Sequence, residues 1–408
     1  MKNLPRGLWV LLIANAVIAL GYGLIAPALP IFATAFGVSS AAAALVVSSF
    51  ALMRLTFAPT TGRLVTKLGE RKIYLTGLLI VAVSTFACAF AQEYWQLLVF
   101  RAAGGVGSTM FSVSAMALLI RLSPQEVRGR ASGYFSAGFL VGSLTGPLIG
   151  AALVGFGLRL PFVVYGIALL IAAAVVAAMM PAPPETTPDG PGEEADTASL
   201  PSAPTFFASL RLREYRAILT SNFAQGWASM GVRVALVPLF VQDGLGYGTE
   251  WAGIILACYA AGNVVAILVS GRLSDRYGRR PVMIPGLIVA AAGTLALGYS
   301  PDIWVALALT AVAGVGSGLF APTHQAALGD MLAGKRRGGS ALAAYGMASD
   351  LGAVSGPLIT GLIADAFGFG PAFVVTGAVV LLALATWLAA PAGLTTSSAT
   401  RSADPIRR

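Results

Sequence analysis

The chain has 408 residues, of which 57% are hydrophobic and only 11% are charged, and its mean hydropathy is +0.81. Soluble domains carry about 25% charged residues, so a water-soluble globule of this size could not cover its surface with so few charges. A polytopic membrane protein could, because a helix crosses a bilayer with about 20 apolar residues. The composition therefore excludes a soluble protein and favours an all-α integral membrane protein.

The composition also argues against several kinds of site. Cys88 and Cys258 lie in apolar runs without metal-ligand spacing, and His324 is the single histidine, so we expect no metal site. No phosphate-binding loop, activated nucleophile or pair of acidic residues stands out in the sequence. We therefore expect neither an enzyme nor an ATP-driven machine, and no bound cofactor.

The first element begins close to the N-terminus. Lys2 and Arg6 precede an apolar run, and the segment 14–16 (Ala-Asn-Ala) resembles a signal-peptide cleavage site. The run continues to about Pro30, which is too long for the apolar region of a signal peptide. We therefore expect a retained first helix.

Twelve apolar segments follow one another in two groups of six. They lie at about 8–30, 41–61, 72–91, 94–118, 130–155, 161–180, 216–240, 250–270, 281–299, 303–325, 340–363 and 371–391. Between the groups, residues 181–204 hold seven prolines and five acidic residues, a composition typical of disorder. The expected organisation is a bundle over 1–180, a cytoplasmic linker over 181–212, a second bundle over 213–391 and a tail over 392–408.

The positive charges predict the orientation in the membrane. If the N-terminus is cytoplasmic, 22 of the 26 Lys and Arg residues lie in segments on the cytoplasmic side, as the positive-inside rule requires. The net charge of +9 therefore reflects topology and not nucleic-acid binding. We expect a multi-pass protein of the cell's plasma (inner) membrane with both termini in the cytoplasm.

Internal repetition relates the two groups of helices. The segment 62–72 (GRLVTKLGERK) matches 271–281 (GRLSDRYGRRP) at an offset of 209 residues. The glycine-rich segment 104–108 recurs as 313–317 at the same offset. Two parallel six-helix repeats are typical of transporters that work by alternating access at the interface between the halves.

These motifs resemble those of the major facilitator superfamily, specifically its twelve-helix drug:proton antiporter branch. The family's loop between helices 2 and 3, repeated between helices 8 and 9, carries a central Asp. Asp275 matches it in the second copy, whereas Thr66 replaces it in the first. If an acid–base latch in this loop takes part in gating, the second copy is expected to carry it. The alternative is a plain basic loop with tight turns.

The fifth segment carries the family's antiporter glycine signature, except that the final glycine of the signature is an alanine. Gly138, Gly142, Gly146 and Gly150 recur every four residues and so form one bare stripe on a helix. Pro147 should bend the helix there. The resemblance implies exchange and not symport, although the stripe could serve helix packing alone.

Charges inside the predicted spans are the candidates for coupling transport to protons. Asp350 is the only acidic residue well inside a span, which makes it the best proton carrier available. Arg101 lies in the fourth span, and in the family this arginine is implicated in proton transfer. Helix 2 packs against helix 11 in this fold, so Arg54 and Asp350 are expected to form an ion pair that breaks on protonation. A permanent structural pair is the alternative.

A mixed aromatic and polar cavity is expected to bind the substrate. Its candidate residues are Asn15, Tyr22, Phe111, Gln225, Trp227, Arg233, Tyr259, His324 and Tyr345. Aromatic residues at helical spacing often serve packing, and His324 fits a packing role better than proton transfer.

The sequence thus predicts a monomeric secondary transporter that exports drugs or other lipophilic small molecules in exchange for protons, as in antibiotic resistance. One alternative is a proton symporter or facilitator for uptake of a sugar, organic acid or other metabolite. Another is a membrane receptor or scaffold that has lost transport.

Overall fold

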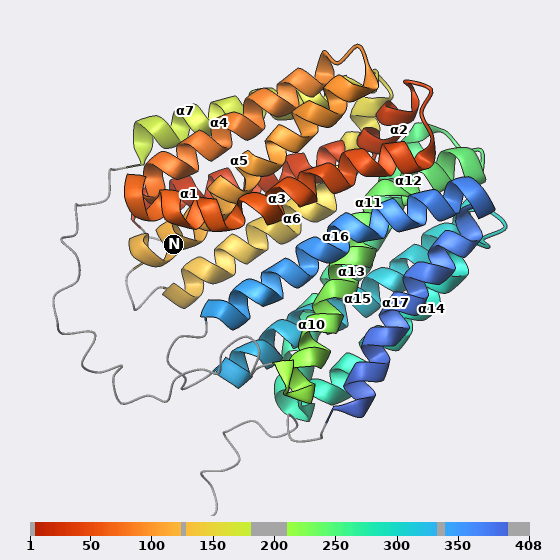
Figure 1. Cartoon of the computed structure of the whole chain (residues 1–408). Coiled ribbons are helices and arrows are strands. Elements are labelled where there is room, and N and C mark those ends of the chain that lie inside the picture. Colours follow the sequence, from red (N-terminus) through yellow and green to blue (C-terminus); the bar gives the residue numbers. More distant parts are fainter. Residues whose placement is uncertain (1–4, 124–127, 181–209, 333–338, 391–408) are drawn as a thin grey trace, which may run out of the picture.

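In the computed structural model, described for residues 5–123, 128–180, 210–332 and 339–390, the chain is a bundle of long helices (Figure 1). Twelve helical spans in these ranges are long and apolar enough to cross a membrane, which confirms the predicted all-α, twelve-helix fold. Helices suit this role because a backbone in lipid must satisfy all its hydrogen bonds internally.

The first half contains six spans. They are α1 (Arg6–Ile25) with α2 (Ala28–Thr34), α3 (Ser40–Leu68), α4 (Glu70–Ala89), α5 (Tyr94–Leu122), α6 (Arg128–Val154) and α7 (Leu160–Met179). Pro27 lies between α1 and α2, where the first span is interrupted, because proline cannot donate the next helical hydrogen bond.

The second half repeats this order. Its seventh span is made of α10 (Arg213–Gln225), η2 (Gly226–Val232), α11 (Arg233–Ala235), α12 (Val237–Leu239) and η3 (Phe240–Gly244). The others are α13 (Thr249–Tyr277), α14 (Arg279–Leu297), α15 (Ile303–Leu332), α16 (Gly339–Phe367) and α17 (Phe369–Ala389). The segments η2 and η3 are π-helical, a rare form that is frequent at functional sites.

Several helices run beyond the predicted apolar segments. Helix α3 continues to Leu68 where the apolar segment ends at 61, and α13 reaches Tyr277 where it ends at 270. The added turns carry charged residues, since a helix keeps its backbone hydrogen bonds after it leaves the hydrocarbon layer. Most of the predicted linker and the whole tail lie outside the described residues.

The halves form two groups that converge around α2, α11 and α12 and diverge toward the first turns of α1 and α10 (Figure 1). We call the side where α1 begins and α17 ends the terminal face, and the other side the opposite face. Helix α3 packs on α16 and α6 packs on α13 between the halves, while α2 contacts α11, α12 and α13 at the opposite face.

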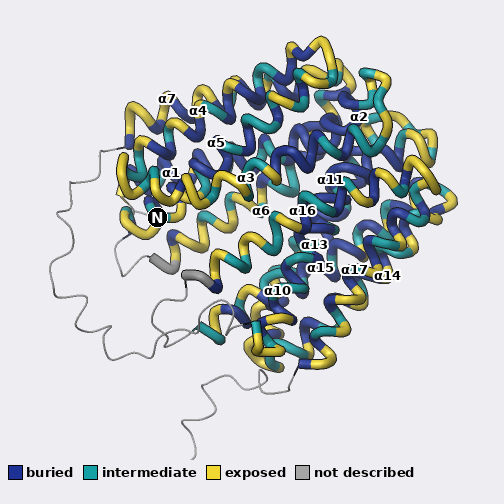
Figure 2. The backbone as a smooth tube through the Cα atoms, viewed as in Figure 1, coloured by how far each residue is buried: buried dark blue, intermediate teal, exposed yellow. Residues whose placement is uncertain are grey.

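Buried residues lie inside both bundles and where the halves converge around α2 and α11 (Figure 2). Large apolar side chains such as Val83 and Leu268 are exposed on the outer sides of the helices, as a lipid-facing surface requires. The interface between the halves is therefore one internal region where polar groups and space can combine.

Candidate functional site

A cavity of about 400 Å³ lies between the halves; we call it the main cavity. Its aromatic lining comes from the first half and consists of Tyr22, Phe50, Phe111, Phe135, Phe139 and Tyr165. The second half contributes Met230, Ser349, Asp350 and Ala353. A mostly apolar, aromatic chamber with a few polar groups is the usual form of a small-molecule site.

The main cavity contains the predicted ion pair. The Nε atom of Arg54 on α3 lies 3.7 Å from Oδ1 of Asp350 on α16. The two side chains are 38% and 25% exposed, so solvent reaches both. The pair joins the two halves, which is what a contact that changes between access states must do. Its role in gating stays a prediction.

Arg101 projects into the same cavity from α5 and is 6% exposed. Its guanidinium carbon lies 4.0 Å from the centre of the Phe50 ring, a cation–π contact. Its Nε atom has no hydrogen-bond partner, and no acidic side chain forms an ion pair with it within the described ranges. The first half therefore holds a buried cation whose charge is balanced by a ring face and not by an acid.

The cavity is closed toward the opposite face by a contact that the sequence did not reveal. Asp365, near the end of α16, accepts hydrogen bonds from the backbone N–H groups of Ser40 and Ala41, both at 2.9 Å. These groups form the N-terminus of α3, where unpaired N–H groups favour a carboxylate. One side chain of the second half thus caps a helix of the first half.

The glycine stripe of α6 packs directly on α1. A Cβ atom on Gly142 would lie 2.5 Å from the backbone nitrogen of Leu20, and one on Gly146 would lie 2.5 Å from the oxygen of Leu20. Gly150 faces the carbonyl oxygen of Leu24 in the same way, whereas Gly138 leaves more room. Bare glycines let the helix backbones touch, which fits the packing interpretation of the stripe.

The other side of α6 meets the second half. A Cβ atom on Gly253 of α13 would lie 2.5 Å from the carbonyl oxygen of Pro147. Helix α6 is therefore held between α1 of its own half and α13 of the other half. The close contacts on both sides show that the signature serves helix packing, and its role in exchange stays a prediction.

A salt bridge holds the basic loop in each half, and the positions of its acidic and basic partners are exchanged between the halves. Arg279 binds Asp275 at 2.7 Å and Asp330 of α15 at 2.8 Å. In the first half Glu70 binds Arg121 at 2.9 Å. Glu70 and Arg279 occupy repeat-related positions, as do Arg121 and Asp330. Asp275 therefore belongs to a salt-bridge cluster, and the first half keeps an equivalent bridge without it; a role of Asp275 in gating stays a prediction.

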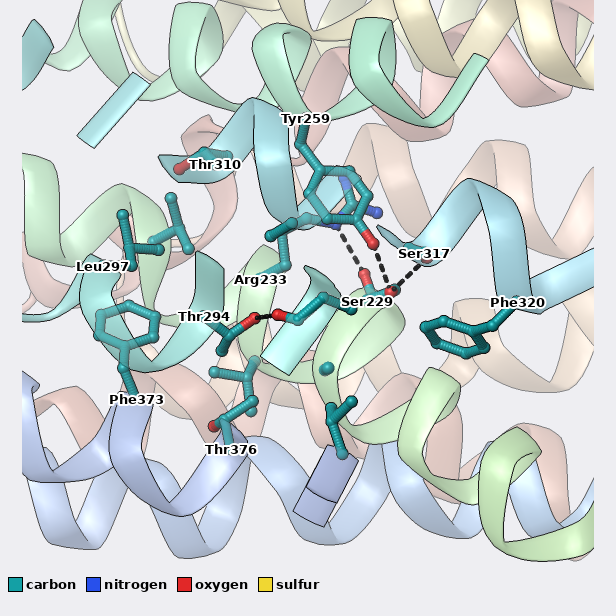
Figure 3. Close-up of a pocket in the computed structure, with 16 residues that line it drawn as sticks. Ser229, Arg233, Tyr259, Thr294, Leu297, Thr310, Ser317, Phe320, Phe373 and Thr376 are labelled. Carbon is teal, nitrogen blue, oxygen red and sulfur yellow. Dashed lines mark hydrogen bonds between the residues drawn. The ribbon is translucent and has the colours of Figure 1, made fainter. Parts of the chain in front are cut away.

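A second, smaller pocket of about 40 Å³ lies inside the second half; we call it the small pocket (Figure 3). Arg233 and Tyr259 line it together with Ser229 and Ser317. The hydroxyl groups of Ser229 and Tyr259 are 2.6 Å apart. Ser317 in turn donates to Oε1 of Gln225 at 3.0 Å.

The expectation that all the substrate candidates share one cavity is wrong. Asn15, Tyr22 and Phe111 line the main cavity, whereas Arg233 and Tyr259 line the small pocket. The remaining four candidates line neither space and are Gln225, Trp227, His324 and Tyr345.

The reason is that Trp227 and His324 are buried in the second half, while the half-buried Gln225 and Tyr345 contact Ser317 and His324 there. Trp227 is buried beside Phe223, with ring centres 5.8 Å apart. The ring centre of His324 lies 5.8 Å from that of Phe320 and 5.7 Å from that of Tyr345. Helical position alone did not show which way they face.

Sequence reasoning missed Phe50, Tyr165, Met230 and Asp365. The first three lie in apolar runs, where nothing separates a cavity side chain from a lipid-facing one. Asp365 lies near the end of α16, and the sequence does not show that it meets a helix of the other half. In the described part of the chain no group of three or more His, Cys, Asp or Glu side chains could hold a metal ion.

Two six-helix bundles around a central cavity, closed at one face, define a membrane transporter of the alternating-access type. The model of the Major Facilitator Superfamily matches residues 11–255 and 218–406, and the chain belongs to this family. It is therefore a transporter and not an enzyme, as the sequence predicted.

Several relatives bear names connected with drug resistance. Multidrug resistance protein 1 of Bacillus subtilis (strain 168) is 27% identical over 357 residues, which cover 87% of this chain and 89% of that protein. Quinolone resistance protein NorA of Staphylococcus aureus is 29% identical over 185 residues, 45% of this chain and 48% of NorA. These similarities confirm the resemblance to the multidrug efflux type.

Among solved structures, a bacterial homolog of the human lysosomal transporter Spinster, in an inward-facing and unoccupied conformation, has a TM-score of 0.78. It is 17% identical, and the match covers 94% of this chain and 96% of that one. At this identity the likeness shows the fold alone.

Proposed function

We propose that this chain exports lipophilic small molecules, drugs included, across the plasma membrane in exchange for protons. The observation that carries the proposal is the Arg54–Asp350 pair, which spans the two halves inside an aromatic cavity. The aromatic lining suits flat, lipophilic molecules, and the relatives named for multidrug and quinolone resistance point to the same substrates.

Protons and substrate are proposed to compete for the ionised carboxylate of Asp350 in this pair. With Asp350 ionised, the pair holds α3 and α16 together and offers a carboxylate to a cationic substrate. Protonation removes the negative charge, which frees Arg54 and lets the halves rearrange. Asp350 lies in a partly enclosed cavity, where changing a charge has a larger effect than in open water.

The proposal includes an orientation and an energy source. By the positive-inside rule, the basic loops favour a cytoplasmic terminal face, and in that orientation Asp365 and α2 close the described conformation toward the outside. A membrane potential of about 100 mV supplies about 2.3 kcal/mol per charge moved, which sustains a gradient of roughly fortyfold. No bound cofactor takes part, and one monomer contains both helix bundles of the transporter.

The test uses inverted membrane vesicles that contain the protein and are energised to an acidic interior. Ethidium or a quinolone added outside should cause a substrate-dependent proton leak. Asp350→Asn should abolish the leak, whereas Asp243→Asn, an exposed acidic residue outside the cavity, should not. A leak that persists in Asp350→Asn would refute the proposed proton carrier.

The uptake alternative remains an outcome of this test. A symporter for sugars needs several amide and carboxylate groups to bind hydroxyl-rich molecules. In the main cavity the amide of Asn15 already donates to the carbonyl oxygen of Phe135 at 3.0 Å. If no lipophilic compound causes a leak, a metabolite uptake screen would replace export as the next experiment.

A further inference from the structure

A groove of about 610 Å³ lies at the terminal face, between the start of α10 and the end of α17; we call it the terminal groove. The two helices pack on each other there (Figure 1). The residues that shape the groove are Arg213, Arg216, Leu219 and Thr220 of α10 and Thr386 and Ala389 of α17. None of them lines the main cavity, so the groove is separate from the proposed transport site.

The end of the groove nearest the water carries positive charge. Arg213 and Arg216 are exposed and lie on one face of α10, because residues three apart on a helix are neighbours. Among the described residues, no acidic side chain forms an ion pair with either of them. A third guanidinium lies beside the groove, since Nη2 of Arg280 donates to the carbonyl oxygen of Leu388 at 2.9 Å. The groove therefore suits a negatively charged group at this end.

The deeper part of the groove is apolar. It reaches Thr220, seven residues after Arg213, or about 10 Å further along α10. The hydroxyl oxygens of Thr220 and Thr386 lie 2.7 Å apart, and each is also within hydrogen-bond distance of a carbonyl oxygen of its own helix. Both hydroxyl groups are thus used within the protein, and Leu219 and Ala389 offer an occupant apolar surface.

The groove adjoins the lipid-facing surface of α17. Leu382 lies one turn before Thr386 on the same face of the helix and is 63% exposed. Leu388, next to Ala389, is 53% exposed. Exposed leucines on the outer side of a membrane-spanning helix contact lipid chains. An occupant of the groove therefore meets positive charge at one end and the hydrocarbon layer at the other.

The arginine pair is not required by the repeat. At the offset of 209 residues, Arg213 and Arg216 correspond to Leu4 and Gly7. Helix α1 packs on α7 in the first half as α10 packs on α17 in the second, without these two charges. Packing of the two helices therefore does not explain why α10 begins with this pair.

We propose that the terminal groove binds one anionic phospholipid, with its phosphate diester held by Arg213 and Arg216 and an acyl chain lying along Leu219 and Leu382. Guanidinium groups form strong charge-assisted hydrogen bonds with phosphate, and basic pockets between membrane helices bind anionic lipid headgroups. The lipid enters sideways from the bilayer and needs no passage through the main cavity. Once bound, it joins the start of the seventh span to the end of the twelfth. The proposal does not rest on drug export.

The test counts lipids bound to the purified full chain by native mass spectrometry. Dioleoyl phosphatidylglycerol is compared with dioleoyl phosphatidylcholine, which has the same acyl chains but no net charge. The wild type should bind one phosphatidylglycerol in preference to phosphatidylcholine. Arg213→Gln combined with Arg216→Gln should weaken phosphatidylglycerol binding by roughly twenty-fivefold, about fivefold for each arginine. Phosphatidylcholine binding should not change.

Arg63→Gln combined with Lys67→Gln is the matched control. These two residues are exposed, lie four positions apart near the end of α3 and do not line the groove. Their replacement removes the same charge from the terminal face and should leave the lipid preference intact. If this control weakens phosphatidylglycerol binding as much as the groove variant does, the effect comes from overall charge and the proposal fails.

Two further measurements test the place of the acyl chain. Ala389→Trp keeps both arginines but fills the apolar part of the groove, so it should also weaken phosphatidylglycerol binding; undiminished binding would contradict the proposed position of the chain. Glycerol 3-phosphate, at the same concentration as the lipid, should not displace it. Displacement would show a site for a free phosphate, and it would overturn the proposal, as would a wild type without preference for the anionic lipid.

Discussion

The contact of Asp365 with the first turn of α3 predicts how firmly the opposite face is closed. The carboxylate oxygens accept from Ser40 N and Ala41 N, both at 2.9 Å, and join residues more than 320 positions apart in the chain. Asp365→Asn removes the negative charge and leaves a single acceptor oxygen. The perturbation is confined to one contact between the halves, since the helices themselves are unchanged.

The size of the effect follows from the geometry. A charged group at an exposed helix N-terminus contributes about 0.3–1 kcal/mol, and a capping hydrogen bond contributes about 0.5–2 kcal/mol. Because this site is exposed to solvent, we expect a loss of about 1–2 kcal/mol from the closed state. This corresponds to a shift of about five- to thirtyfold toward conformations open at the opposite face.

Spin labels can measure this shift directly. Labels at Phe156 and Trp304, both strongly exposed at the opposite face, report the distance between the halves in a cysteine-free background. Asp302→Asn is the matched control, because Asp302 also caps a helix N-terminus, accepting from Val305 N at 2.9 Å, but within its own half. A distance distribution in Asp365→Asn that equals that of Asp302→Asn would refute the reasoning.

Three further predictions concern other parts of the interface. Gly146→Ala should lower the Tm by the equivalent of about 1–3 kcal/mol, because its Cβ would press on α1. Gly133→Ala is the control and should not lower the Tm, because a Cβ there has nothing within 4 Å; equal losses in the two variants would contradict the packing argument. Glu70→Arg should impair transport in vesicles because it places two positive charges together. Adding Arg121→Glu should restore transport, since the second half has the basic and acidic partners in that order; if the double variant does not recover transport, this bridge does not act as a latch. The affinity for ethidium, measured by fluorescence, should fall as pH falls, because protonation removes the carboxylate charge of Asp350. Asp350→Asn should bind ethidium weakly and with an affinity that does not depend on pH. If the pH dependence remains in this variant, Asp350 is not its source.

The helices could be predicted from the sequence because membrane insertion depends on hydropathy, which is a local property that adds up along the chain. An apolar stretch of about 20 residues is sufficient to define a span, so the twelve helices could be placed without tertiary information. Their ends could not be placed as well, since α3 and α13 continue through charged residues outside the apolar stretch.

The Arg54–Asp350 pair could also be predicted, although not from geometry. Charges are so scarce inside the spans that few pairings were possible, and the resemblance to the family indicated that their helices meet. The bridge is present at 3.7 Å, although α3 extends further past Arg54 than the predicted segment did.

Hydropathy and internal repetition were sufficient to predict a twelve-helix membrane transporter built from two repeats, because both are properties of the chain alone. Which side chains share a cavity depended instead on how the helices pack. The direction of Arg233 depends on the π-helical segment η2, and a π-helical turn rotates every later side chain relative to an α-helix. The cap formed by Asp365 depends on two segments far apart in the chain that meet only when the halves pack at the opposite face.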